Sequence, residues 1–493
     1  MYKRQHPITI LLGIRIASLL PLIILVLFKP DEQVEPWYLF YLFLLVVLFI
    51  MAIFSAIKWY FKVYWIENNI LHIKHGVFVK KESYLNKERV QNISTSSNII
   101  YQMLGLMKLN IEVAGGGNEP EVMLAGIKED EAKHLISLLH KKETTVKEEI
   151  EEEESKTVYQ LTAKEVLAAA ITSGRFGLVF SGLVLLYTKF DFVLPEGFTS
   201  KVEAYVMGNG VYKLIVIALI LMAISWIIST AGYVLKYANF KIERKGEEIR
   251  IVQGLFEKKE FVLKLHRIQA ITVKEGMLRQ PFGYCAVEVE AIQSIGAASN
   301  EVMLHPFMKK KDVQHLITYL ELPYEIEAEI VHLPKTALRR YFIMGWLISI
   351  ILTVLIASVS IYFKQYIALF VILPLFIVFS LLAYARYKSG GYELRENQLT
   401  VVYRNFSKYT GIMRRRHVQA VGYNQSYFQR KDELCTTFVA VAGRGYEVKH
   451  MRKKDSLRIY NWYKEKGNTG VYWCFVFVIK LISFVESLIY FKI

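Results

Sequence analysis

Apolar runs alternate with charged, mixed segments along this chain, and the runs come in three pairs. Each run is about 20 residues long, which is the length that crosses a bilayer as a helix. The predicted spans cover residues 8–28, 37–57, 166–187, 211–233, 341–362 and 367–385. The pattern therefore predicts three transmembrane helical hairpins.

A mixed segment follows each pair of apolar runs. Its apolar residues fall in short runs separated by Gly, Asn and Asp, which is typical of strands joined by turns. Its last stretch, for example residues 129–140, places apolar residues at helical spacing. We expect each mixed segment to form a small β unit that ends in a helix.

A five-residue motif recurs in the three mixed segments. It reads Arg-Val-Gln-Asn-Ile at residues 89–93, Arg-Ile-Gln-Ala-Ile at 267–271 and His-Val-Gln-Ala-Val at 417–421. Gly76 and Gly254 precede the Gln of the first two copies by 15 residues, and the third copy lacks this Gly. Matches that keep a common register indicate a triplicated domain, with the third copy the most diverged.

The chain is therefore predicted to be an α+β membrane protein of three tandem units. Each unit has a transmembrane hairpin and then a β domain: 1–57 with 58–140, 161–234 with 235–322, and 333–385 with 386–464. Residues 141–160 form an acidic linker. The apolar tail, 465–493, is predicted to be either an interfacial helix or a seventh span because it contains Lys480 and Glu486.

Charge places the chain at a membrane surface. The net charge is +16, which suits an anionic leaflet; it would also suit nucleic acid, but no nucleic-acid motif accompanies it. The three cysteines are odd in number and unpatterned, which fits a reducing compartment. Lys and Arg are enriched in the β units, whereas the outer loops carry few of them. The positive-inside rule therefore predicts a cytoplasmic N-terminus and cytoplasmic β units in the cell membrane.

The motif copies, the Gly254-Leu255-Phe256 turn and Leu161-Thr162 before a span resemble those of YdbT-type bacterial membrane proteins, which carry the second subtype of bacterial pleckstrin-homology-like (PH-like) domain. The resemblance covers about residues 8–464. It implies seven-stranded, bent β-sandwiches, each capped by a C-terminal helix. It also implies a smaller single-copy PH-like membrane protein as partner, and links some members to protection against membrane-active bacteriocin peptides. The family has no known catalytic residues.

The repeated motif gives the first set of candidate site residues. They are Arg89, Gln91, Arg267, Gln269, His417 and Gln419. The Gln residues could contact a ligand or a subunit, or bond a neighbouring backbone within the strand. The Arg residues could bind lipid phosphate or form structural ion pairs.

Basic runs give the second set, the candidates for lipid contact. They include Lys309, Lys310, Lys311, Arg414, Arg415 and Arg416. A solvated face is the alternative for these runs. Arg15 and Arg175 lie near the start of a predicted span, where they either anchor the helix at the interface or line a path for an ion.

No HExxH, GxSxG, Walker loop or paired catalytic carboxylates are present, so the sequence predicts no enzyme, no cofactor and no metal. A non-enzymatic membrane scaffold that binds partners or lipid, as a homo- or hetero-oligomer, is the favoured interpretation. A transporter or channel component is the alternative. It should show polar or broken helices along a pathway.

Overall fold

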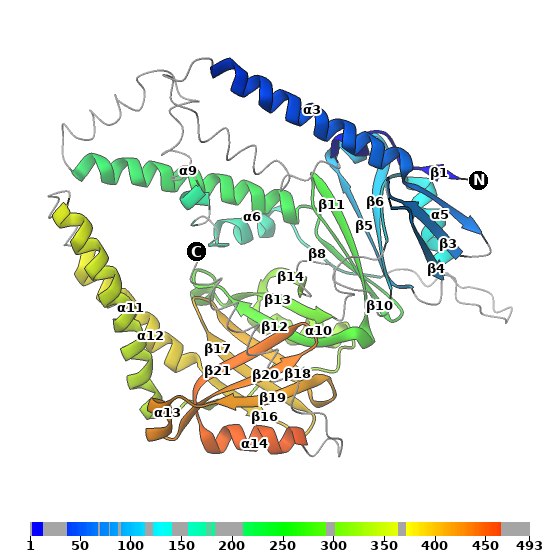
Figure 1. Ribbon diagram of the computed structural model, residues 1–493. Helices are drawn as coiled ribbons and strands as arrows, with labels where there is room; N and C mark the ends of the chain where they lie inside the picture. The colour runs from blue at the N-terminus through cyan, green and yellow to red at the C-terminus, as the bar shows by residue number, and fades with distance from the viewer. Residues whose placement is uncertain are drawn as a thin grey trace.

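The computed structural model describes twelve stretches of the chain (Figure 1). They are residues 2–12, 37–67, 70–77, 79–86, 90–113, 122–140, 156–174, 177, 179–182, 211–291, 301–362 and 371–464. The acidic segment 141–155, the tail 465–493, and the predicted sites Arg15, Arg89 and Arg175 lie outside the described residues.

Besides its membrane segment, the described part of the first unit has seven strands and two helices. The strands are β1 (Lys3–Arg4), β2 (Val63–Glu67), β3 (Ile70–His75), β4 (Lys81–Asn86), β5 (Val90–Asn98), β6 (Leu106–Val113) and β7 (Val122–Lys128). The short α4 (Ile99–Met103) joins β5 to β6, and α5 (Glu129–His140) closes the unit.

The second and third units repeat this order. The second has β8 (Lys156–Gln160), β9 (Lys241–Lys245), β10 (Glu248–Gln253), β11 (Glu257–Lys264), β12 (Ile268–Glu275), β13 (Tyr284–Ala291), β14 (Glu301–Lys309) and α10 (Val313–Tyr319). The third has β15 (Val331–His332), β16 (Gly391–Leu394), β17 (Gln398–Arg404), β18 (Lys408–Arg414), β19 (Val418–Asn424), α13 (Tyr427–Lys431), β20 (Leu434–Val441), β21 (Arg444–Arg452) and α14 (Lys453–Lys464).

The first strand of each unit precedes that unit's membrane segment in the sequence. β1 pairs with β2, β8 with β9 and β15 with β16, all antiparallel. In the third unit, for example, Val331 lies opposite Tyr392 and both membrane helices lie between them in the chain. Each membrane segment is therefore a long insertion between two paired strands.

The three units share their sheets. The first half of unit one forms the four-stranded sheet β1-β2-β3-β4. Its second half joins the first half of unit two in the seven-stranded sheet β7-β6-β5-β11-β10-β9-β8, and units two and three join in β14-β13-β12-β18-β17-β16-β15. The three-stranded sheet β19-β20-β21 ends the series (Figure 1). We call the strand pairs β5–β11 and β12–β18 the two seams.

Each unit has its own apolar core, and the cores of units two and three also interlock. The core of unit two includes Ile412 of unit three, and the core of unit three includes Ala270 of unit two. Both residues belong to seam strands. A continuous sheet with a core on each side fixes the two units relative to each other.

In the described part of the chain, four long apolar helices emerge from the β units. They are α3 (Trp37–Phe61), α9 (Val211–Tyr237), α11 (Lys335–Tyr362) and α12 (Ile372–Ser389). Segments 218–237, 335–358 and 372–389 are long and apolar enough to cross a membrane, and α3 contains a shorter apolar stretch, 45–61. The indole nitrogen of Trp346 on α11 donates to Ser380 Oγ on α12 at 3.0 Å, so these two helices pack against each other.

The predicted third span, residues 166–187, is not one unbroken helix. α6 (Ala163–Ile171) begins at a capping box between Thr162 and Glu165 and ends at Ile171. Gly174 follows in the left-handed region, at φ +66°, the conformation that commonly ends a helix. The prediction of a continuous helix is therefore wrong here.

Candidate membrane-facing surface

Two loops of each unit expose large apolar side chains. The turn tips lie between the third and fourth strands and expose Val79 in unit one, Leu255 and Phe256 in unit two, and Phe406 in unit three. The helical tips lie between the fifth and sixth strands. They expose Ile99, Ile100, Met103, Leu104, Met277, Leu278, Phe282, Tyr427 and Phe428. Full burial of one such side chain is worth about 1.5–3 kcal/mol.

The turn tips are hydrogen-bonded to the ends of membrane helices. The amides of Gly254 and Leu255 donate to the carbonyls of Ala238 and Leu235, at the end of α9, at 2.8 and 2.9 Å. In unit three, Arg386 Nε of α12 donates to the carbonyl of Asn405 at 3.2 Å. In units two and three the turn tips therefore lie beside the ends of α9 and α12 from which the chain enters the β domain.

A glycine fixes the shape of the turn tip in the first two units. Gly76 and Gly254 have φ of +111° and +103°, and a Cβ on either would lie 2.0 Å from a backbone oxygen. No side chain fits at these positions. Arg404 replaces this Gly in unit three and belongs to β17 instead, so the repeat diverges at this turn.

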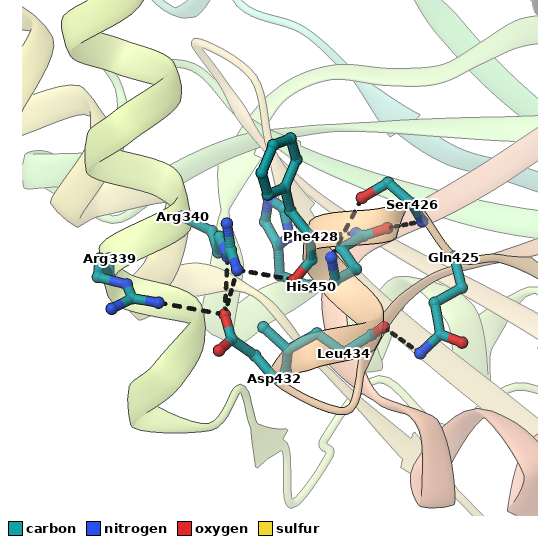
Figure 2. A network of polar contacts seen from close by, with 9 residues as sticks. Arg339, Arg340, Gln425, Ser426, Phe428, Asp432, Leu434 and His450 are labelled. Carbon is teal, nitrogen blue, oxygen red and sulfur yellow. Dashed lines mark hydrogen bonds and ion pairs between the residues drawn. The ribbon is translucent and has the colours of Figure 1, made fainter.

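Figure 2 shows how the helical tip of unit three is fastened to α11. Arg340 Nε donates to Asp432 Oδ2 at 2.8 Å, and its Nη2 donates to the carbonyl of Phe428 at 2.7 Å. The Arg340 hydrogen bond lowers the pKa of the Asp432 carboxyl below its ordinary value. Arg339 adds an ion pair to the same oxygen at 3.5 Å.

In unit two, a buried arginine fastens the helical tip to α6. Arg279 Nη2 donates to the carbonyl of Ala169 at 2.7 Å, and Nη1 donates to the carbonyl of Pro306 at 2.8 Å. Its guanidinium also lies over the rings of Tyr233 and Phe307. A cation at the carbonyl end of a helix is favoured by the helix dipole. The sequence did not single out Arg279, because Tyr101 and Gln429 hold its place in the other units.

The predicted lysine run lies at this same end of unit two. Lys309, Lys310 and Lys311 line a cavity of about 660 Å³, together with Phe282 of the helical tip and Lys408 of β18. The cavity therefore opens at the seam between units two and three, beside an exposed phenylalanine.

The charge in this cavity is only partly balanced. Lys310 Nζ lies 3.1 Å and Lys408 Nζ 3.4 Å from Glu275 Oε1. Burial lowers the pKa of the Lys408 ammonium, which Glu275 partly opposes. Burial also lowers the pKa of Arg404. Four lysines, Lys309–Lys311 and Lys408, outnumber the two carboxylates at the cavity, Glu275 and the lining Glu327, and a net positive charge suits an anion.

The predicted arginine run lies at the other end of the sheet. Arg414 ends β18, the strand that Lys408 begins, so about 20 Å of strand separates them. The guanidinium of Arg415 lies 5.4 Å from the ring centre of Trp462 on the closing helix. The structure thus separates the two predicted lipid-contact runs.

The repeated Gln is the extra residue of a β-bulge in all three units. The register shifts between Val90 and Asn92, between Ile268 and Ala270, and between Val418 and Ala420. The skipped residues are Gln91, Gln269 and Gln419. A bulge bends its strand and re-aims side chains, which explains why this position repeats.

Motif copies two and three meet at the seam. His417 Nδ1 lies 3.2 Å from the carbonyl oxygen of Gln269, and Tyr324 bridges the same site, 3.3 Å from His417 Nδ1 and 3.1 Å from the carbonyl of Ile268. The Gln269 amide donates to the carbonyl of Arg267 at 3.2 Å. Here the motif supports contact between units, and its Gln side chain bonds its own strand.

Among the described residues, no three His, Cys, Asp or Glu side chains cluster in a way that could hold a metal ion. The described part of this surface consists of apolar tips and lysines.

These features define a transmembrane protein built on bacterial PH domains. The sequence profile of the Bacterial PH domain family matches residues 14–143, 192–323 and 342–467, so the chain belongs to this family. The chain is also similar to the UPF0699 transmembrane protein YdbT of Bacillus subtilis (strain 168). The two are 31% identical over 499 residues, which cover 95% of this chain and 99% of the relative.

Proposed function

We propose that this protein is a non-enzymatic membrane scaffold whose PH-like units rest on an anionic leaflet. The main observation that supports this proposal is that apolar side chains and lysines gather at the end of the units to which the membrane helices are attached. The apolar tips enter the headgroup region, and the lysine cavity of units two and three binds a lipid phosphate. Each lysine near an anionic leaflet contributes about 1 kcal/mol.

The leaflet is the cytoplasmic one in this proposal. The support is the distribution of charge: Lys and Arg are enriched in the β units, and the loop at residues 29–36 is acidic. Cysteine labelling of intact cells at exposed Lys133 of α5, which lies outside the tips, tests this orientation. A membrane-impermeant reagent should label Cys at this position only after the cells are broken, and labelling of intact cells would reverse the assignment.

Depth-dependent quenching tests the contact of the tips with lipid. Phe282→Cys and Tyr427→Cys each carry a fluorescent label in the full chain, reconstituted in vesicles that contain brominated lipid. Both labels should be quenched. The matched control is His266→Cys, which is exposed at the opposite end of β11. Quenching no stronger than that of the control would refute the contact.

Charge substitution tests the lysine cavity. Lys309→Gln with Lys311→Gln should reduce the enrichment of anionic over neutral lipid that co-purifies with the chain. The control, Lys245→Gln with Lys264→Gln, removes the same charge at the far end of unit two. Equal loss in both variants would show a general charge effect and no lipid site.

We extend the proposal to protection against membrane-active peptides, which the resemblance of the repeated motif to YdbT-type proteins implies. Deletion of the gene should lower tolerance to a panel of bacteriocins, and expression of the intact chain should restore it. If the variant Lys309→Gln with Lys311→Gln also restores tolerance, protection does not depend on lipid binding in the lysine cavity. Unchanged tolerance after deletion would remove the protective role.

A further inference from the structure

The sheet series of this chain has two open ends. Among the described residues, β4 pairs only with β3, and β19 pairs only with β20. Their counterparts do not end a sheet: β11 and β18 hold the place of β4, and β5 and β12 hold the place of β19. In each seam the fifth strand of one unit pairs with the fourth strand of the next.

The two seams use the same register. Ser97 lies opposite Lys258 in the first seam, and Glu275 lies opposite Lys408 in the second. Ser97 and Glu275 hold the same position relative to the repeated Gln, and so do Lys258 and Lys408. The pairing is therefore a property of the repeat, which leaves the last fifth strand and the first fourth strand without their partners in the described residues.

In units two and three, the repeated Gln is buried where its strand pairs with the next unit and exposed where its strand ends a sheet. Gln269, on the covered strand β12, is 7% exposed, whereas Gln419 at the same position of β19 is exposed. Tyr423 of β19 is 37% exposed. On the other open strand, Tyr84 is 61% exposed.

The sequence of β19 lacks the usual protection of a sheet edge. Its residues 418–424 include no charged side chain and no proline, two of the devices that keep edge strands from pairing with other chains. Its bulge at Gln419 does not prevent pairing, because β5 and β12 carry the same bulge and pair with β11 and β18. An open, uncharged edge is a template for another strand. The two seams also indicate which strand should pair here, namely the fourth strand of a unit.

We propose that a second copy of this chain continues the sheet, with β19 of one copy paired to β4 of the next. The register of the seams then places Tyr423 opposite Glu82, Val421 opposite Tyr84 and Ala420 opposite Leu85. The last pair reproduces that of Ala270 with Met413 in the second seam, a small residue facing a large one. Because the two edges differ, the contact is heterologous and builds a chain or closed ring of copies. This assembly goes beyond lipid contact and does not depend on it.

Disulfide cross-linking in native membranes tests the proposal. The three cysteines of the full chain are first replaced by alanine. Two differently tagged copies are then co-expressed, one with Tyr423→Cys and the other with Glu82→Cys. Oxidation should shift both tags to one band of two chains. A chain that carries both substitutions should give a ladder of higher bands.

Two controls calibrate the result. Ser97→Cys with Lys258→Cys, opposite each other in the first seam, should close a disulfide within one chain and confirms that seam geometry is cross-linked. Glu67→Cys, exposed on β2 of the same unit as β4, should not cross-link to Tyr423→Cys.

Failure of the cross-link between copies while the seam control forms would overturn the proposal. Capture of a smaller PH-like protein by either edge, with no band of two chains, would also overturn it in favour of a different occupant. A substituted chain that no longer forms the seam disulfide would be misfolded. In that case, isotope-labelled and unlabelled copies of the unsubstituted chain are mixed and joined with a lysine-specific cross-linker. A cross-linked peptide pair that joins Lys81 of a labelled copy to an unlabelled copy supports the proposal, and its absence overturns it.

Discussion

Acidification should loosen unit two through one buried histidine, His305. It lies on β14, is fully buried, and its ring contacts those of Tyr159 and Phe240. Its Nδ1 accepts a hydrogen bond from the amide of Phe307 at 3.3 Å. Burial lowers the pKa of His305 to about 4, and nearby Glu165 opposes this only in part. The folded unit therefore holds this imidazole neutral.

The magnitude follows from the two pKa values. An imidazole in the unfolded chain has a pKa of about 6.5, and each pH unit between the two values is worth about 1.4 kcal/mol. Above pH 6.5 both states are neutral, and this stability is fully present. As the pH falls from about 6.5 to about 4, only the unfolded state gains a proton, so the free energy of unfolding falls by about 3 kcal/mol.

Hydrogen exchange of the full chain in detergent measures this effect locally. Peptides from β13 and β14 give the free energy of opening between pH 7 and pH 4, after correction for intrinsic exchange. His305→Asn keeps an acceptor near the Nδ1 position and removes the titration, so its opening free energy should change less with pH. The control is His315→Asn, on the exposed face of α10, which should follow the unsubstituted chain. An unchanged pH dependence in His305→Asn would refute the reasoning.

Two further changes test the seam and the repeat. Arg444→Met removes the partner of the buried carboxylates of β13, which it meets across the seam at 2.7 and 3.5 Å. It should cost about 3–5 kcal/mol, measured as faster exchange in β12 and β18, whereas exposed Arg452→Met should change little. Glu433→Gly should stabilise unit three by about 1 kcal/mol in thermal unfolding, because Glu433 has φ +55° and is exposed. Gly283 holds the same repeat position, with φ +70° and open space where an added Cβ would lie, so Gly283→Ala should lower the free energy of unfolding by a similar amount. Destabilisation by both changes would contradict this account.

Much of each unit could be predicted from the sequence. The pairing of β2 with β3, the closing helix at 129–140 and the β20–β21 hairpin all follow from local patterns, and the structure confirms them. The positive φ of Gly105, Gly283 and Glu433 also follows the register of the repeat. These features are determined by residues that are close together in the chain, so one sequence is enough to predict them.

The joining of sheets could not be predicted in this way. Pairing of β12 with β18 is made by backbone groups, which every residue carries, so side-chain patterns do not identify the partner strand. The leading strands β1 and β15 have only two residues each, too few to show an alternating pattern. The lysine cavity brings Lys309 and Lys408 together from two units, and Arg279 acts at a position where the repeat does not conserve the residue type.

The leading strands tie the synthesis of each unit to the membrane. β15 leaves the ribosome before α11 and α12, yet its partner β16 follows them. The sheet of unit three therefore cannot be completed until both α11 and α12 have been made and the chain has returned to β15. Until then β15 lacks its partner strand, and an unpaired strand edge is a template for pairing with another chain.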